Sequence, residues 1–289
     1  MQPQFELTIG NLLPPATLLT LVCGVWSIYF FLHVLPLLQL TLPASHFSPE
    51  VAFRGWVHCI AGLALTTMML ICFFRAALTM PGQVPEGEEW RFGTFKDPNA
   101  IREVKFSGER RRCKHCLIYK PDRCHHCRIC HCCILKMDHH CPWIMNCVGF
   151  RNHKYFFLLV IYSILSCGFI ALTITETIVQ SLEQELPLSH RFLLMQCFTT
   201  ASIMGALLTI FAGFHVMLML RGLTTIEFCE KMSIVANNSK SSKYDLGLYR
   251  NVTAVVGPRP WLWLLPLDPP VGDGLQFDLT APGQDPEWT

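Results

Sequence analysis

Charged residues are scarce in this chain of 289 residues. Asp, Glu, Lys and Arg make up 15% of it, whereas about 25% is usual in soluble proteins. Four segments contain none of these residues, and each reaches the roughly 20 residues that a helix needs to cross a bilayer: 16–38, 55–74, 155–175 and 192–220. Buried core helices of a soluble protein explain four such runs poorly. The sequence therefore predicts a mainly α membrane protein with four transmembrane helices.

Other features that the sequence lacks argue against several classes of function. A net charge of +2 argues against a nucleic-acid-binding protein, which needs a strongly basic surface. A metal transporter is disfavoured because the few titratable residues near the spans, His33, His58, His215 and Glu176, form no pair of ligands at i, i+4. Residues 1–15 contain no Lys or Arg, so we expect the first span to be an uncleaved anchor and not a signal peptide.

The Lys and Arg residues are unevenly distributed. Of the 23, 14 lie between Thr79 and Lys154, and six lie at Arg221 or beyond. The positive-inside rule therefore predicts that these two segments, and with four spans the N-terminus, face the cytosol. The expected organisation is two spans in residues 1–78, a cytosolic domain in 79–154, two spans in 155–220 and a cytosolic C-terminal region in 221–289.

Cysteine is abundant in the first cytosolic segment, where nine of the 15 cysteines lie between residues 113 and 147. Cys113, Cys116, His126 and Cys133 read C-x2-C-x9-H-x6-C. The same spacing recurs 14 residues later in Cys127, Cys130, His140 and Cys147. Each set offers the four ligands of a closed structural zinc site, and a reducing cytosol favours zinc thiolates over disulfides. The pattern predicts two interleaved Cys3His zinc sites in a cysteine-rich domain between spans 2 and 3.

One cysteine belongs to neither set. The 14-residue register makes Cys141 the start of a third repeat in which Ile144 occupies the place of the second cysteine. Pro142 favours an extended backbone at Cys141, and alternate side chains of an extended segment share a face. His139 and Cys141 should then lie together, with His140 directed to its zinc on the other side. Such a thiol beside an imidazole suits nucleophilic catalysis.

The partner of Asp138 stays open at this point. Strict alternation places it on the side of His140, where a carboxylate could orient the zinc ligand. Only a turn would let it reach His139.

These residues resemble the cysteine-rich domain of the DHHC protein S-acyltransferases, also called palmitoyltransferases. The resemblance extends to two motifs near the C-terminus, Thr224-Thr225-Ile226-Glu227 and Asn251-x3-Val255-x-Gly257. It rests chiefly on Cys113-x2-Cys116, Lys120-Pro121-Asp122-Arg123, His125-His126-Cys127, Asp138-His139-His140-Cys141-Pro142-Trp143 and Asn146-Cys147-Val148-Gly149. It implies that Cys141, activated by His139 and with Asp138 as a further catalytic residue, takes a long-chain acyl group from acyl-CoA and passes it to a substrate cysteine.

The resemblance also implies the partners. They are the lipid bilayer, a fatty acyl-CoA donor and membrane-associated proteins with cytosolic cysteines. We expect a multi-pass protein of the Golgi or endoplasmic reticulum, with the plasma membrane as the alternative. The rival interpretation is a membrane-anchored zinc-finger adaptor or RING-like ubiquitin ligase. Such a protein would need no free thiol at Cys141, and RING modules have their metal ligands in a different order.

Overall fold

The computed structural model describes residues 9–92, 101–105, 107–183, 186–233, 242–268 and 270–280. Within these ranges four helices are long and apolar enough to cross a membrane, as the charge-free segments predict. Each helix extends beyond its charge-free segment: the first takes in the uncharged residues 10–15, and the other three continue through charged residues at the membrane border. The four helices span Gly10–Leu38, Pro49–Leu78, His153–Glu183 and Leu188–Leu220. The chain divides into two compact units, one of residues 15–71 with 159–212 and one of 72–158 with 213–289 and the N-terminal residues to Pro14.

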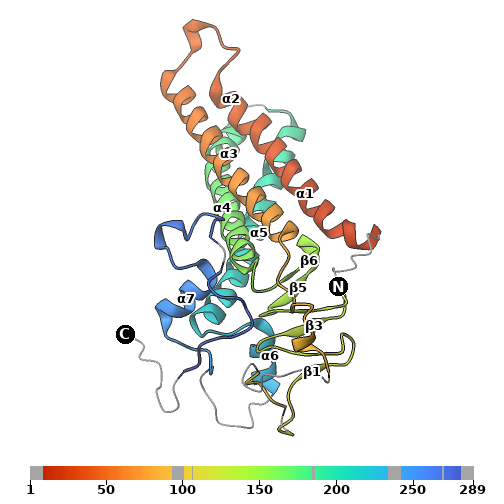
Figure 1. Ribbon diagram of the computed structural model, residues 1–289. Helices are drawn as coiled ribbons and strands as arrows, with labels where there is room; N and C mark the ends of the chain where they lie inside the picture. The colour runs from red at the N-terminus through yellow and green to blue at the C-terminus, as the bar shows by residue number, and fades with distance from the viewer. Residues whose placement is uncertain are drawn as a thin grey trace. The chain divides into compact units, whose positions relative to one another are not determined.

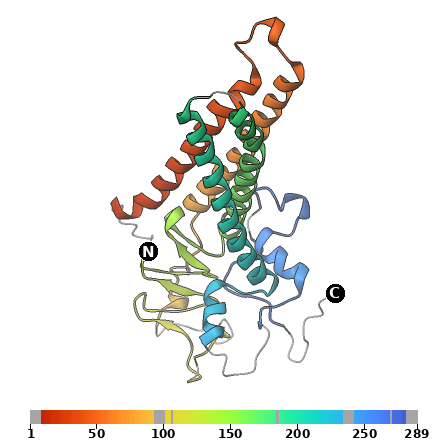
Figure 2. The same cartoon turned by 180° about the vertical axis from the view of Figure 1, so that it is seen from behind.

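The first unit is a bundle of the apolar helices, which run side by side in both views (Figures 1 and 2). They are α1 (Ile9–Tyr29), continued by the π-helical turn η1 (Phe30–Val34) and α2 (Leu35–Leu38), then α3 (Pro49–Leu78), α4 (His153–Glu183) and α5 (Leu188–Leu220). Buried Tyr29, Ile174 and Leu194 form part of its core.

The π-helical turn η1 carries a buried histidine. π-Helical turns are rare and occur mostly as single turns inside α-helices. Here His33 Nδ1 lies 2.6 Å from Thr177 Oγ1, and its Nε2 lies 2.9 Å from His58 Nδ1. Both ring nitrogens of this intramembrane histidine therefore have partners, as an apolar environment requires.

The second unit is built on three successive β-hairpins (Figure 1). Their first strands end at Cys113, Cys127 and Cys141, which pair with Ile118, Cys132 and Asn146. The turns contain Leu117, His131 and Met145, all with positive φ of 56°, 53° and 49°. The strands are β1 (Arg112–Cys113) with β2 (Ile118–Tyr119), β3 (His125–Cys127) with β4 (Cys132–Ile134), and β5 (His139–Cys141) with β6 (Asn146–Val148). The 14-residue repeat of the sequence is thus a repeat of hairpins, and Cys141 does begin a third copy of the pattern.

The third hairpin is attached to the end of α3. Asn146 Nδ2 lies within hydrogen-bonding distance of the carbonyls of Ala76, Ala77 and Thr79, at 3.2, 3.0 and 2.9 Å. The last carbonyls of a helix lack partners within the helix, so the amide satisfies groups that would otherwise need water. Close packing continues at Gly149, where a Cβ atom would lie 2.9 Å from Pro81 O and 2.7 Å from an Ile134 methyl.

The C-terminal region adds two short helices, α6 (Thr225–Ser233) and α7 (Leu248–Val256). Short 3-10 turns complete the described structure at Ala44–His46, Glu88–Trp90, Pro142–Ile144 and Pro260–Leu262. Thr224 and Glu227 form a capping box at the start of α6, because Thr224 Oγ1 accepts from Glu227 N and Glu227 Oε2 accepts from Thr224 N. Asn251 of α7 donates to Leu220 O at the end of α5, at 2.9 Å.

A buried ion pair joins α6 to the hairpins. Arg123 donates from Nε and Nη2 to the two carboxylate oxygens of Glu227 at 2.6 and 2.8 Å, and Nη2 also donates to Gly222 O. The two side chains are only 6% and 11% exposed. Burial raises the pKa of Glu227, but the Arg123 charge and its hydrogen bonds outweigh burial and lower it. The pair therefore stays ionised at neutral pH and fixes α6 on the cysteine-rich segment.

Replacement of Arg123 by Ala should destabilise the protein strongly. It leaves the Glu227 carboxylate buried without its partner, which costs about 3–5 kcal/mol. The matched control is Arg54→Ala, which breaks the Arg54–Glu176 pair with side chains 45% and 40% exposed, and should cost less than about 1 kcal/mol. Thermal unfolding of the two purified variants in detergent measures the difference, and equal losses would contradict the importance given to burial.

Candidate active site and metal centres

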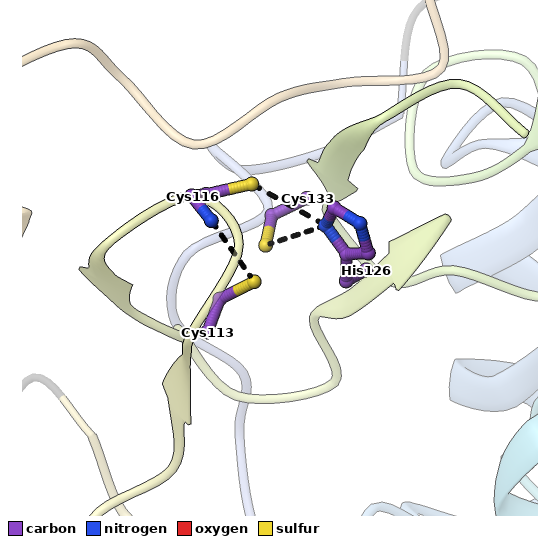
Figure 3. Close-up of side chains that lie close together, drawn as sticks. All are labelled: Cys113, Cys116, His126 and Cys133. Carbon is purple, nitrogen blue, oxygen red and sulfur yellow. Dashed lines mark hydrogen bonds between the residues drawn. The ribbon is translucent and has the colours of Figure 1, made fainter. Parts of the chain in front are cut away.

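The first predicted ligand set comes together around the first two hairpins (Figure 3). One ligand atom from each of Cys113, Cys116, His126 and Cys133 lies within 4.8 Å of the others. His126 Nδ1 lies 3.3 Å from Cys116 Sγ and 4.0 Å from Cys133 Sγ. Cys113 Sγ accepts a hydrogen bond from the Cys116 backbone N–H at 3.4 Å, which orients the thiolate and offsets part of its charge.

The second set comes together around the second and third hairpins in the same way. His140 Nδ1 lies 3.6, 3.4 and 3.5 Å from the sulfurs of Cys127, Cys130 and Cys147. Ligands bound tetrahedrally at about 2.0–2.3 Å are themselves about 3.5 Å apart, so these spacings fit one ion at the centre of the four atoms. The chemistry of the donor set, three sulfurs and one imidazole nitrogen, suits a soft or borderline metal. Both clusters could therefore bind a metal ion.

Cys141 lies outside both clusters. It ends β5 with φ −107° and ψ 109°, the extended conformation expected before Pro142, and it is 6% exposed. In the first two hairpins the residue three positions after this cysteine is a second cysteine, whereas here it is Ile144, which is 1% exposed and fills the space with an apolar side chain. The thiol of Cys141 thus has the backbone position of a metal ligand without the partner that would complete a C-x2-C pair.

His139 interacts with both Asp138 and Cys141. Its Nδ1 is 2.7 Å from Asp138 Oδ2. Burial would lower the pKa of His139, but its hydrogen bonds with Asp138 and Cys141 raise it to about 9. The ring also meets Phe156 edge to face, with centroids 4.9 Å apart. The imidazole is therefore oriented on one side by a carboxylate and interacts with the thiol of Cys141.

Asp138 is the most buried of the three residues, with a side chain 1% exposed. A buried carboxylate needs donors, and Thr225 provides two of them: its backbone N–H donates to Oδ1 at 2.9 Å and its hydroxyl to Oδ2 at 2.8 Å. Burial raises the pKa of Asp138, yet the hydrogen bonds and the nearby histidines hold it well below its usual range. Of the two partners that the sequence leaves open for Asp138, the structure places His139 beside the carboxylate.

The contacts of two further residues in this site could not be predicted from the sequence. Thr225 belongs to a motif that the family resemblance includes, but its contact with Asp138 joins residues 87 positions apart. His215 of α5 is 7% exposed, and its Nδ1 lies 4.0 Å from Asp138 Oδ2. A histidine among apolar residues of a span is a signal of intramembrane function, although its partner cannot be read from the sequence.

Asp138, His139 and His215 form a third group with ligand atoms within 4.8 Å of one another. In this group, however, the carboxylate already accepts two hydrogen bonds from Thr225 and one from His139. These bonds suit a carboxylate that orients an imidazole, as in other sites where a nucleophile, a base and an acid act together.

The metal content of variants separates the ligands from the other residues. His140→Ala should lower the bound metal from two ions per chain toward one, because it removes a ligand of the second cluster and weakens the third hairpin. The adjacent change His139→Ala should leave both ions in place, as should Cys141→Ser. Elemental analysis of purified protein measures the ratio, and equal metal loss in the His139 and His140 variants would refute the division between the two sides of β5.

Comparison with known proteins agrees with this arrangement. Residues 107–232 match the family model described as DHHC palmitoyltransferase. Over 182 residues the chain is 39% identical to Palmitoyltransferase ZDHHC2 of Homo sapiens and 40% identical to that of Danio rerio. Each match covers 63% of this chain, and they cover 49% of the human protein and 50% of the Danio rerio protein. It is 37% identical over 177 residues to Palmitoyltransferase ZDHHC15 of Homo sapiens, covering 61% of this chain and 52% of the relative.

The chain thus spans about half the length of the curated relatives that it matches. The matched segment contains both metal clusters, the residues from Asp138 to Cys141 and the contact with Thr225. Residues 107–232 therefore form a domain of the DHHC palmitoyltransferase family.

Proposed function

We propose that the protein is a protein S-acyltransferase that transfers a long-chain fatty acyl group, such as palmitoyl, from acyl-CoA to cysteines of substrate proteins. The observation that carries the proposal is the series Asp138, His139 and Cys141, in which a buried carboxylate orients an imidazole that interacts with a thiol outside both metal clusters. A thiolate is the reactive form of cysteine, and an adjacent base is a common way to produce it.

In the first step, the proton shared by Cys141 and His139 rests on His139, whose pKa is raised to about 9, and Asp138 stabilises this imidazolium. The Cys141 thiolate attacks the thioester carbonyl of acyl-CoA. The carbon–sulfur bond to coenzyme A breaks, and the departing thiolate receives the proton from His139. Cys141 then carries the acyl group as a new thioester. One thioester is exchanged for another, so the reaction needs neither oxidant nor reductant.

In the second step, a cysteine of a substrate protein replaces coenzyme A. His139 accepts its proton, the substrate thiolate attacks the acyl group on Cys141, and the Cys141 sulfur leaves and is reprotonated. The same imidazole therefore serves as base and then as acid in both half-reactions, because each of them exchanges one thiol for another on the acyl group.

We infer that the two clusters hold structural zinc. Three thiolates and one imidazole form a closed tetrahedral set, which leaves no position for a substrate. With three thiolates each zinc centre would carry a net charge of 2 − 3 = −1, so it does little to acidify Cys141. Its contribution is to fix the hairpins, while His139 and Asp138 handle the proton.

We propose the bilayer, acyl-CoA and membrane-associated proteins with cytosolic cysteines as partners. The four apolar helices support a multi-pass protein, and the excess of Lys and Arg in residues 79–154 supports a cytosolic active site. A long acyl chain suits such a protein, because each CH₂ removed from water contributes about 0.8 kcal/mol. We propose the Golgi or endoplasmic reticulum as the compartment.

The direct test is incubation of the purified protein with a labelled long-chain acyl-CoA, followed by hydroxylamine and mapping of the label. We expect a hydroxylamine-labile acyl group on Cys141, and its complete loss in Cys141→Ser with two metal ions retained. Label on a cysteine of either metal cluster, or no label in a sample that holds both ions, would favour the adaptor function instead.

The support of Asp138 by Thr225 can be tested in the same assay. Thr225→Val removes the hydroxyl that donates to Asp138, a hydrogen bond to a charged group that is worth about 1.5–3 kcal/mol, so autoacylation should slow by about 10-fold or more. The control is Thr253→Val, whose exposed hydroxyl donates to the Arg250 carbonyl of its own helix. A Thr225 variant with the rate of the control would show that this contact does not matter for the reaction.

A further inference from the structure

The segment that follows α7 is folded around a lysine of the third span. Lys154 is the second residue of α4, and its ammonium group donates to Leu262 O at 2.9 Å and to Leu267 O at 2.6 Å. The ends of the segment approach each other, with Arg259 Nη1 3.7 Å from Asp268 Oδ1. Because Lys154 lies in the first turn of a membrane-spanning helix, this segment is held at the level where α4 begins.

The segment presents large apolar side chains outward. Trp261 is 75% exposed and Leu264 65% exposed, and neighbouring Leu265, Leu267 and Val271 are 38%, 47% and 66% exposed. From Pro260 to Leu267 the sequence is Pro-Trp-Leu-Trp-Leu-Leu-Pro-Leu. It contains no charged side chain and, apart from the two tryptophan indoles, no side chain that forms hydrogen bonds. A group of apolar side chains of this size on a soluble surface would be unfavourable, and such patches mark interaction sites.

The outward direction of these side chains is fixed by the fold of the segment. Trp263 points the other way: its indole N–H donates to Gly257 O at 2.9 Å, and its ring lies 6.3 Å from that of Tyr249. Pro266 is buried, and Leu265 N donates to Leu262 O at 3.1 Å. Trp263 and Pro266 thus anchor the segment to the protein, whereas Trp261 and Leu264 stay exposed.

We propose that the apolar segment Pro260–Leu267 docks into the interfacial layer of the bilayer, on the same side of the membrane as the cysteine-rich domain. The occupant of this surface is lipid. The surface adjoins the first turn of α4, which itself enters the membrane, and Trp with Leu is the composition of interfacial anchors. The segment is too short to span, so it lies along the surface. Lys154 is 5% exposed, and its bonds to two carbonyls hold the loop beside the start of α4.

This contact gives the C-terminal region a second attachment to the membrane, independent of the proposed acyl transfer. Asn251 attaches α7 to the end of α5, and Lys154 attaches the following segment to the start of α4. Insertion of Trp261 and Leu264 into lipid would fix this region against the bilayer.

Photocrosslinking of the full chain tests the proposal. A benzophenone amino acid is placed at position 261 or 264, and the protein is irradiated in phosphatidylcholine nanodiscs. Position 172 is the positive control, since Leu172 of α4 is 80% exposed on a span, and position 117 is the negative control, since Leu117 is 61% exposed in the β1–β2 turn. The mass of the intact protein should increase by one phospholipid at 261, 264 and 172, and not at 117.

Crosslinks from 261 and 264 to a second protein chain, or lipid adducts no more frequent than at 117, would overturn the proposal. Retention of two metal ions per chain identifies variants that have folded, and no acyl transfer is needed for the readout, so failure of the proposed enzyme function leaves this test intact.

Native side chains provide a second measurement. Brominated lipids quench tryptophan within the bilayer, so Trp261→Phe should remove part of the lipid-quenchable fluorescence. Trp90→Phe, which removes an indole 5% exposed in the cysteine-rich domain, should leave the quenchable part unchanged. Equal quenching in wild type and Trp261→Phe would contradict insertion of this residue.

Discussion

The carboxylate of Asp138 is the group on which the organisation of the site depends. A carboxylate 1% exposed is stable only if its oxygens are hydrogen-bonded, and its donors come from two distant parts of the sequence. His139 is its neighbour in sequence, whereas Thr225 follows the last span by a few residues. Burial of Asp138 therefore requires the C-terminal segment to be in place, and so couples the geometry of the imidazole to the folding of a segment far along the chain.

The ion pair of Arg123 and Glu227 supports this coupling from the other direction. Thr225 can donate to Asp138 only if the start of α6 is held against the hairpins, and Glu227 holds it there through Arg123 while it also caps the helix. A buried pair of this kind contributes little net stability compared with apolar packing. Its value is positional, because the direction of two charge-assisted hydrogen bonds leaves α6 little freedom to slide or rotate.

The sequence predicts what local spacing and composition determine. Four charge-free runs predict the spans, and the ligand spacing of the cysteine-rich segment predicts both clusters and the free thiol of Cys141. The side of Asp138 could not be predicted, because alternation applies only within β5, which begins at His139. The contacts of Thr225 and His215 with Asp138 were equally inaccessible, since they depend on how separate segments pack. The π-helical turn at His33 likewise follows from partners on other helices.

The third hairpin contributes to the second metal cluster and also carries the residues of the proposed acyl transfer. His140 of β5 and Cys147 of β6 are direct partners in the strand pair and both belong to the second metal cluster. Alternation along β5 then directs His139 and Cys141 to the other side, where Ile144 replaces the cysteine that would have made Cys141 a ligand. A bound ion would fix the strand without contacting the reacting sulfur. Catalytic geometry tolerates displacements of only about 0.5 Å, so activity should depend on the metal through the rigidity of this hairpin.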